Sequence, residues 1–182
     1  MSRGGSPSLS RACRIARRCA LLLLGMAGGV AAAPTPQEYI SGFVLYVRWP
    51  EDDQVKGWQV CVASATDNAD AQYAGRQVRD RPFAVRHLKA GELLDGCQIL
   101  DLTSAEPATA VALLKATQSR RSLLTVGNGR DFCSAGGMIC LLADQPRGGF
   151  EVNLSAIRGA GFAINARLLM MARQFEAAGA PP

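Results

Sequence analysis

The chain has 182 residues, 48% hydrophobic and 19% charged, a balance that fits one globular domain with a short extension and excludes a disordered chain. One histidine and six cysteines argue against most histidine-dependent catalysis, most zinc sites and a miniprotein built on disulfides. The net charge of +5 does not indicate nucleic-acid binding, because five of the basic residues precede position 34 in a segment without acids. Residues 34–182 are therefore neutral.

The first 33 residues have the parts of a secretory signal peptide. Basic residues end at Arg17 and Arg18, and an apolar run from Cys19 to Val30 leads into three alanines. The run is shorter than the roughly 20 residues that span a membrane. A twin-arginine signal and an uncleaved membrane anchor remain alternatives for this segment. The predicted organisation is a signal peptide at 1–33, a domain at 34–176 and a flexible tail at 177–182.

The domain opens with the signals of a helix start. Thr35 suits the N-cap, Pro36 suits the first helical position, and Glu38 completes a capping box. Apolar residues then recur at helical spacing, which predicts one stripe facing the core. We expect this helix to end at Trp49, because Pro50 disfavours helical backbone in the residue before it.

From Trp58 onward, short apolar strands alternate with helical or turn-rich segments. The expected strands are 58–63, 83–88, 97–102, 122–127, 137–143 and 149–153. The expected helices are 67–75, 105–118 with Ser104 as its cap, 154–160 and 167–176. Residues 127–129 are expected to form a turn. The alternation predicts a single α/β domain with a mainly parallel or mixed sheet covered by helices, in a three-layer sandwich.

Four cysteines follow the leader, and an oxidising compartment favours disulfides over free thiols. They are Cys61, Cys97, Cys133 and Cys140, which allow three connectivities. Cys61 and Cys97 lie on strand-like segments that could be neighbours in a sheet, whereas Cys133 and Cys140 close a short loop. We therefore favour the pairs Cys61–Cys97 and Cys133–Cys140. A metal site is disfavoured because these cysteines include no Cys-x-x-Cys pair.

No motif of nucleophilic or nucleotide chemistry is present: the sequence has neither Gly-x-Ser-x-Gly nor a Walker loop. His87 alternates with Phe83 and Val85, which predicts a partly buried, hydrogen-bonded histidine. With all four cysteines oxidised, His87 has no thiol to activate, and no catalytic triad is assembled. We expect no enzymatic activity, no cofactor and no metal.

The segment near residue 150 offers a candidate binding strip. Glu151 and Asn153 share one face of an expected strand, where a carboxylate and an amide can receive a donor such as Arg147 or Arg158. A solvent-exposed face or a local salt bridge explains the same pattern equally well. We expect a partner or ligand surface in the C-terminal third, at Glu151, Asn153, Arg147, Ile157, Arg158 and Met170.

Taken together, these features resemble the YfiR family of exported bacterial regulators over roughly residues 37–173. The ordered matches are Arg48-Trp49-Pro50, Val60-Cys61-Val62, Cys97 at a strand start, Leu124-Thr125-Val126, Phe132-Cys133, Gly136-Gly137-Met138-Ile139, and Arg147 with Phe150-Glu151-Val152-Asn153.

The resemblance implies a periplasmic inhibitor that binds the periplasmic sensor domain of an inner-membrane diguanylate cyclase. Such an inhibitor holds cyclic-di-GMP synthesis off and limits exopolysaccharide and biofilm. The resemblance also implies a homodimer, disulfides at the four cysteines that link redox state to repression, and an outer-membrane lipoprotein that can sequester the inhibitor.

A second class of function stays open, a periplasmic sensor or carrier of an unknown small molecule. Its candidate contacts are Tyr39, Tyr46 and His87. A thiol oxidoreductase is disfavoured, because the spacing of Cys133 and Cys140 is wider than the Cys-x-x-Cys motif of redox enzymes.

Overall fold

The computed structural model describes residue 1 and residues 33–63, 68–89, 91–142 and 148–179. Nearly all of the predicted signal peptide lies outside the described residues, and so does Arg147. None of the helices in the described part of the chain is long and apolar enough to span a membrane.

Seven strands form one mixed sheet in the order β3-β4-β2-β5-β6-β7-β8. The five inner strands run parallel to their neighbours, while β3 and β8 pair antiparallel at the two edges. The predicted mainly parallel or mixed sheet is therefore confirmed. The strands are β2 (Trp58–Val62), β3 (Gln77–Val78), β4 (Arg81–His87), β5 (Ile99–Asp101), β6 (Leu124–Asn128), β7 (Ile139–Leu141) and β8 (Phe150–Val152).

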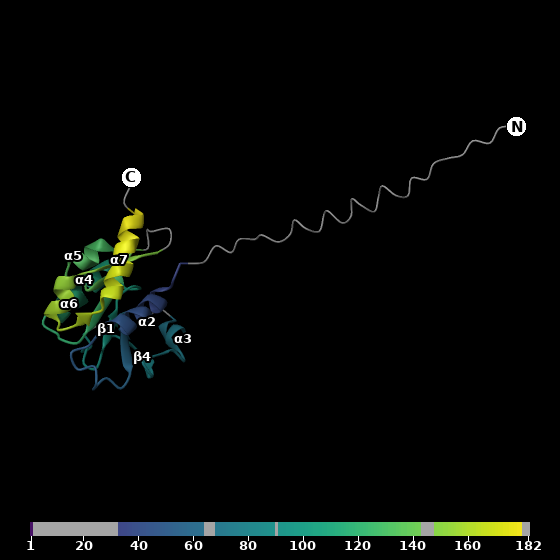
Figure 1. Ribbon diagram of the computed structural model, residues 1–182. Helices are drawn as coiled ribbons and strands as arrows, with labels where there is room; N and C mark the ends of the chain where they lie inside the picture. The colour runs from purple at the N-terminus through teal and green to yellow at the C-terminus, as the bar shows by residue number, and fades with distance from the viewer. Residues whose placement is uncertain (2–32, 64–67, 90, 143–147, 180–182) are drawn as a thin grey trace. The chain divides into compact units, whose positions relative to one another are not determined.

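Helices cover both faces of this sheet. Along β2, Val60 and Val62 face one hydrophobic cluster, whereas Cys61 between them faces a second. The first cluster includes side chains of α2 (Pro36–Tyr46), α3 (Ala69–Tyr73) and α7 (Ala166–Gly179). The second includes side chains of α4 (Pro107–Thr117) and α5 (Gly129–Ser134). In Figure 1, α4 and α5 lie on one side, with α2 and α3 toward the other, so the fold has three layers. The buried side chain of α6 (Leu154–Gly159), Ile157, packs in the first cluster.

Helix α2 starts where the sequence predicts. The Glu38 amide donates to Thr35 Oγ1 at 3.3 Å, and the Thr35 amide donates to Glu38 Oε2 at 2.7 Å, so the capping box is complete. These two bonds satisfy amide groups that the first helical turn leaves without a helical partner.

The same helix ends earlier than expected, at Tyr46 and not at Trp49. Residues Val47–Arg48 form β1, which pairs antiparallel with β9 (Ala163–Ile164) in a separate two-stranded sheet. Val47 has extended backbone angles, φ −98° and ψ 132°. Pairing with a strand more than a hundred residues away overrides the helical spacing, which sequence periodicity alone cannot reveal.

Three further expectations need correction. Residues 127–129 do not form a turn, because β6 continues to Asn128 and α5 begins at Gly129. Ser104 does not cap the following helix: the N-cap is Glu106, without a side-chain bond, and Pro107 takes the first helical position. Helix α7 extends to Gly179, three residues beyond the expected helix end at 176.

Both favoured disulfides are present, Cys61–Cys97 and Cys133–Cys140, each with a Cα–Cα distance of 5.8 Å. Cys61 lies on β2 and Cys97 lies two residues before β5, and these two strands are parallel neighbours. The expected adjacency of the two strands is therefore confirmed. Loop-closure entropy assigns about 4 kcal/mol to the longer crosslink and about 2 kcal/mol to the shorter one.

Candidate binding surface around helix α5

Helix α5 is a six-residue helix crosslinked to the sheet. Cys133 on the helix bonds to Cys140 in β7, whose side chain is fully buried. Phe132 packs into the cluster beside it, between two glycines of the neighbouring backbone. A Cβ on Gly127 would lie 2.6 Å from the Phe132 ring, and one on Gly137 would overlap the ring. The glycines therefore allow the helix to approach the sheet closely.

Glu151 in β8 and Asn153, which directly follows this strand, hold α5 from the other side. Arg130 Nε lies 2.8 Å from Glu151 Oε1, with the arginine side chain 67% exposed and the carboxylate 21% exposed. Asn153 Nδ2 donates to the backbone oxygen of Cys133 at 3.0 Å. Its Oδ1 accepts from the Ala156 amide at 3.1 Å, which caps helix α6.

The sequence therefore predicted Glu151 as an acceptor but not its donor. Glu151 was expected to meet Arg147, Arg158 or a ligand, whereas the donor is Arg130 on α5. Arg130 directly follows residues 127–129, which were expected to form a turn, and six residues are too few for a helical hydrophobic period. A short apolar pair, Phe132-Cys133, beside charged residues was the only signal available.

The remaining predicted surface residues separate in the structure. Arg158 is exposed on α6. Ile157 is only 1% exposed and packs in the core, so its side chain cannot contact a partner. Met170 is 59% exposed, but it lies on α7, which packs on the face opposite α5. Ile157 was predicted as a surface residue because it is close in sequence to Glu151 and Arg158. The prediction was wrong because Ile157 is the buried residue of the short helix α6.

A groove with a cavity volume of about 330 Å³ lies between α4 and α6, and Gly136, two residues after α5, is among its lining residues. Leu114 and Thr117 line its α4 side, and Ser155 and Gly159 line its α6 side. Asn153, which binds the α5 backbone, also borders this groove. The exposed face of α5 and the groove are thus linked through one side chain.

The alternative ligand contacts are not brought together. Tyr39 stacks near Phe43 and Phe150, its hydroxyl is buried without a hydrogen-bond partner, and burial raises the pKa of Tyr39. Tyr46 lines a cavity of about 300 Å³ beside Arg48, and neither Tyr39 nor His87 is among its lining residues.

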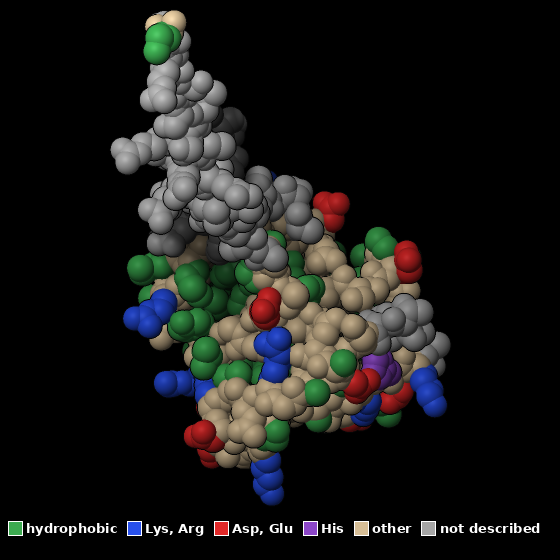
Figure 2. Space-filling model, turned by 90° about the vertical axis from the view of Figure 1, so that its right-hand side faces the viewer, with side chains coloured by type: hydrophobic (Ala, Val, Ile, Leu, Met, Phe, Trp, Pro, Cys, Tyr) green, Lys and Arg blue, Asp and Glu red, His purple; other side chains and the backbone are tan. Residues whose placement is uncertain are grey.

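His87 is partly buried and hydrogen-bonded, as predicted. Its Nε2 lies 2.7 Å from Asp70 Oδ2, which joins β4 to α3. Figure 2 shows the histidine on the surface beside acidic side chains. The position of His87 is thus explained by a contact within the fold.

Among the described residues, no group of three or more His, Cys, Asp or Glu side chains is placed to hold a metal ion. The fold defines a disulfide-crosslinked α/β domain, a construction typical of proteins that mature in oxidising compartments. The chain belongs to the family described as YfiR/HmsC-like, which it matches over residues 36–173. This is a family of periplasmic regulators of diguanylate cyclase signalling, with a regulatory and not a catalytic role.

Proposed function

We propose that this chain represses an inner-membrane diguanylate cyclase by binding its periplasmic sensor domain through α5 and the adjoining groove. The observation that carries the proposal is the way α5 is held. A disulfide, an ion pair and a hydrogen bond fix the helix, yet its Arg130, Asp131 and Ser134 remain exposed. A charged surface that is fixed before binding loses little conformational entropy when a partner docks.

The groove between α4 and α6 adds depth to this charged surface. Its volume of about 330 Å³ lies in the range of sites that accept a small molecule or a few partner side chains. Leu114 and Met138 provide apolar lining, while Asn153 and Ser155 provide polar groups at its border. A partner that inserts an apolar side chain here can reach the charged face of α5 at the same time.

Repression by binding needs no covalent chemistry from this chain. A sensor domain with two conformations shifts toward the one that the inhibitor binds more tightly, by no more than the difference in binding free energy. The inhibitor therefore keeps cyclic-di-GMP synthesis low without crossing the membrane itself. Less cyclic-di-GMP in turn means less exopolysaccharide and biofilm.

Export by cleavage of the leader at 1–33, a homodimeric state, and sequestration by an outer-membrane lipoprotein belong to the same proposal. Redox control fits it as well, because opening Cys133–Cys140 removes the covalent tie between α5 and β7. The oxidised periplasm keeps α5 in its binding position, and a reductant releases it.

The test is the affinity of the purified mature chain for the periplasmic domain of a diguanylate cyclase encoded in the same genome. Arg130→Glu places two carboxylates in contact and leaves α5 with two acidic residues and no basic one, so we expect Kd to rise about tenfold or more. The double variant Arg130→Glu with Glu151→Arg restores the ion pair with reversed polarity. It separates loss of the α5 anchor from loss of a direct contact with the partner.

Arg167→Glu is the matched control, because Arg167 is exposed on α7 in the opposite layer and the charge change is the same. We expect its Kd to stay within about twofold of the unaltered chain. If Arg130→Glu and Arg167→Glu bind with equal affinity, and circular dichroism shows that both are folded, then α5 is not part of the interface.

Small-molecule binding remains a second candidate function. It is favoured by the cavity of about 300 Å³ where Tyr46 lies with Arg48 and Arg79. Calorimetric titration with anionic and aromatic metabolites tests it. A ligand that binds this cavity without changing the affinity for any cyclase domain would favour a carrier over a repressor.

A further inference from the structure

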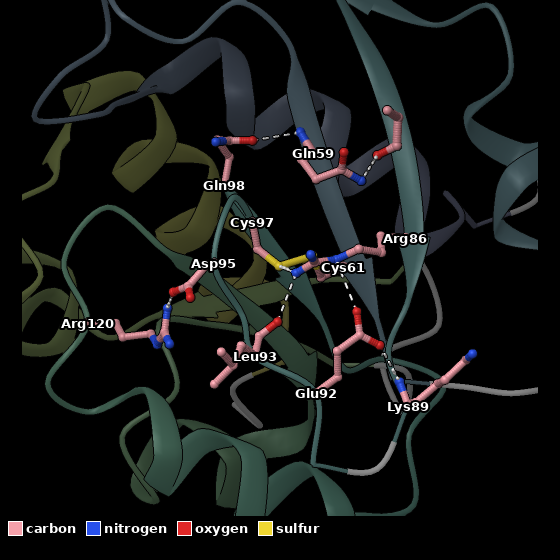
Figure 3. Close-up of a disulfide and its surroundings, with 11 residues drawn as sticks. Gln59, Cys61, Arg86, Lys89, Glu92, Leu93, Asp95, Cys97, Gln98 and Arg120 are labelled. Atoms are coloured by element: carbon pink, nitrogen blue, oxygen red, sulfur yellow. Dashed lines mark hydrogen bonds and ion pairs between the residues drawn. A yellow bond between two sulfur atoms is a disulfide. The ribbon is translucent and has the colours of Figure 1, made fainter.

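The side chain of Arg86 lies against the Cys61–Cys97 disulfide, which is not part of the α5 surface (Figure 3). Arg86 is directly opposite Cys61 in the β2–β4 pairing, so both side chains leave the same face of the sheet. Its Nη2 lies 2.9 Å from Cys97 Sγ and donates to the Leu93 backbone oxygen at 3.1 Å. Its Nε lies 3.8 Å from Glu92 Oε1.

Little solvent reaches the two cysteines of this arrangement. Cys61 is fully buried, Cys97 is 8% exposed, and the Arg86 side chain is 35% exposed with a buried Nε that has no hydrogen-bond partner. Electrostatic interactions at such a site are screened less than at an open surface. The carboxylate of Glu92 compensates only part of the guanidinium charge, because it lies at a longer distance than the sulfur does.

The closed disulfide gives Arg86 a poor partner. A disulfide sulfur is uncharged and accepts hydrogen bonds weakly, whereas a thiolate is an anion that a guanidinium can bind strongly. The contact at 2.9 Å therefore favours the reduced state more than the oxidised state. Nearby cations promote thiolate formation in the same way at reactive cysteines of other proteins.

We propose that Arg86 stabilises the thiolate of Cys97 when the Cys61–Cys97 bond is reduced, and so makes this disulfide easier to reduce. The proposal concerns the chemistry of the sulfur pair and does not depend on which partner the chain binds. Arg86 acts here as a positioning residue for a redox-sensitive crosslink between β2 and the segment that leads into β5.

The reaction balances with a dithiol as reductant. Its first sulfur attacks the protein disulfide and its second sulfur closes a cyclic disulfide, so the protein S–S bond breaks as the S–S bond of the reductant forms. Two electrons pass to the protein sulfurs. Of the two protons of the dithiol, one passes to the sulfur of Cys61 in its apolar surroundings, and the other is released to solvent because Arg86 binds Cys97 as the thiolate.

The same ion pair has a structural consequence. Arg86 touches Glu92, Leu93 and Cys97, so it bridges β4 to the segment that ends at Cys97. After reduction, the guanidinium can hold this segment in place although the covalent bond is gone. Cycles of oxidation and reduction then proceed without unfolding of the neighbouring strands.

The experiment is a redox titration of the oxidised mature chain in dithiothreitol buffers, with the two disulfides quantified separately by alkylation and peptide mass spectrometry. We expect Arg86→Met to lower the equilibrium constant for reduction of Cys61–Cys97 about tenfold. Arg86→Lys, which keeps the charge, stays within about threefold of the unaltered chain. Cys133–Cys140 is the internal control, because no arginine of the described residues donates to its sulfurs, and its constant stays unchanged.

A second measurement uses the unaltered chain, so that the test survives a variant that fails to fold. The rate of Cys97 alkylation by iodoacetamide in the reduced protein is followed against pH. We expect its midpoint to lie below that of an ordinary cysteine, about 8.5, and to rise in Arg86→Met. A midpoint at or above the ordinary value would overturn the proposal, as would equal constants for Arg86→Met and the unaltered chain. A parallel change in both disulfides would overturn it too, since that result reports global stability.

Discussion

Phe132 is the residue that fixes how closely α5 approaches the sheet. Its ring lies against the backbone of Gly127 and Gly137, where a methyl group has no room. The ring, the crosslink at Cys133 and the bond from Asn153 act on one short helix from three directions. A single added carbon at either glycine therefore tests the geometry of the proposed surface.

We expect Gly137→Ala to destabilise the domain by about 1–3 kcal/mol, because the new methyl group overpacks against the Phe132 ring. Urea denaturation measures this change in the free energy of unfolding. The result should appear with both disulfides intact. An unchanged midpoint would mean that the ring does not lie where the structure places it.

Gly42→Ala is the matched substitution, and we expect it to change the free energy of unfolding in the opposite direction. Gly42 lies inside α2, and a Cβ there has nothing within 4 Å. Alanine fits helical backbone better than glycine, so stability should increase by about 0.5–1 kcal/mol. The same denaturation experiment checks it, and a loss of stability would show that this face of α2 is covered.

At the scale of elements, the sequence predicted best those segments whose signals are local. The capping box at Thr35 located the start of α2, and runs of apolar residues located β2, β4, β5, β6, β7 and β8. Buried strands in parallel sheets are continuous hydrophobic runs, which is why β2, β5, β6 and β7 were visible.

Elements set by distant contacts could not be predicted in this way. Strands β1 and β9 have two residues each and exist through their pairing with each other. Helix α5 was hidden by its length and its charged residues, and with it the Arg130–Glu151 pair. Buried Asp101 accepts two hydrogen bonds from Thr103 inside an apolar strand, an arrangement that only tertiary packing defines.

Helix α2 should respond to acid. Hydrogen bonds from the Thr35 amide and side chain lower the pKa of Glu38 below its ordinary value of 4.5. A carboxyl group with a lowered folded-state pKa stabilises the fold above its unfolded pKa, and this contribution is lost as pH falls through the folded value. We therefore expect the stability contributed by the α2 cap to decline below pH 4.5. Thermal unfolding between pH 3 and pH 7 measures it.

Glu38→Gln is the control for this effect. Glutamine keeps a capping-box acceptor but cannot titrate, so the acid-dependent part of the difference should disappear. Equal pH profiles for the two proteins would contradict a role for the Glu38 carboxylate.

For the whole molecule, the two crosslinks should differ in what their removal does. Replacing Cys61 and Cys97 with serine frees the longer loop, and we expect a loss of about 4 kcal/mol. Replacing Cys133 and Cys140 should cost about 2 kcal/mol and leave the domain folded, but with weaker repression because α5 loses its covalent tie. Denaturation and the cellular cyclic-di-GMP concentration measure the two effects. Equal losses of stability for the two double variants would contradict the first prediction, and full repression by the variant without Cys133 and Cys140 would contradict the second.

The central proposal is that this chain represses a diguanylate cyclase from the periplasmic side of the membrane. The most direct measurement is the cyclic-di-GMP concentration in cells that lack the gene and are complemented with either the full chain or a chain without residues 1–33. We expect the cyclic-di-GMP concentration to rise on deletion, to return to its original level with the full chain, and to stay high when the leader is missing. An unchanged concentration on deletion, or equal rescue by the chain without its leader, would contradict the proposal.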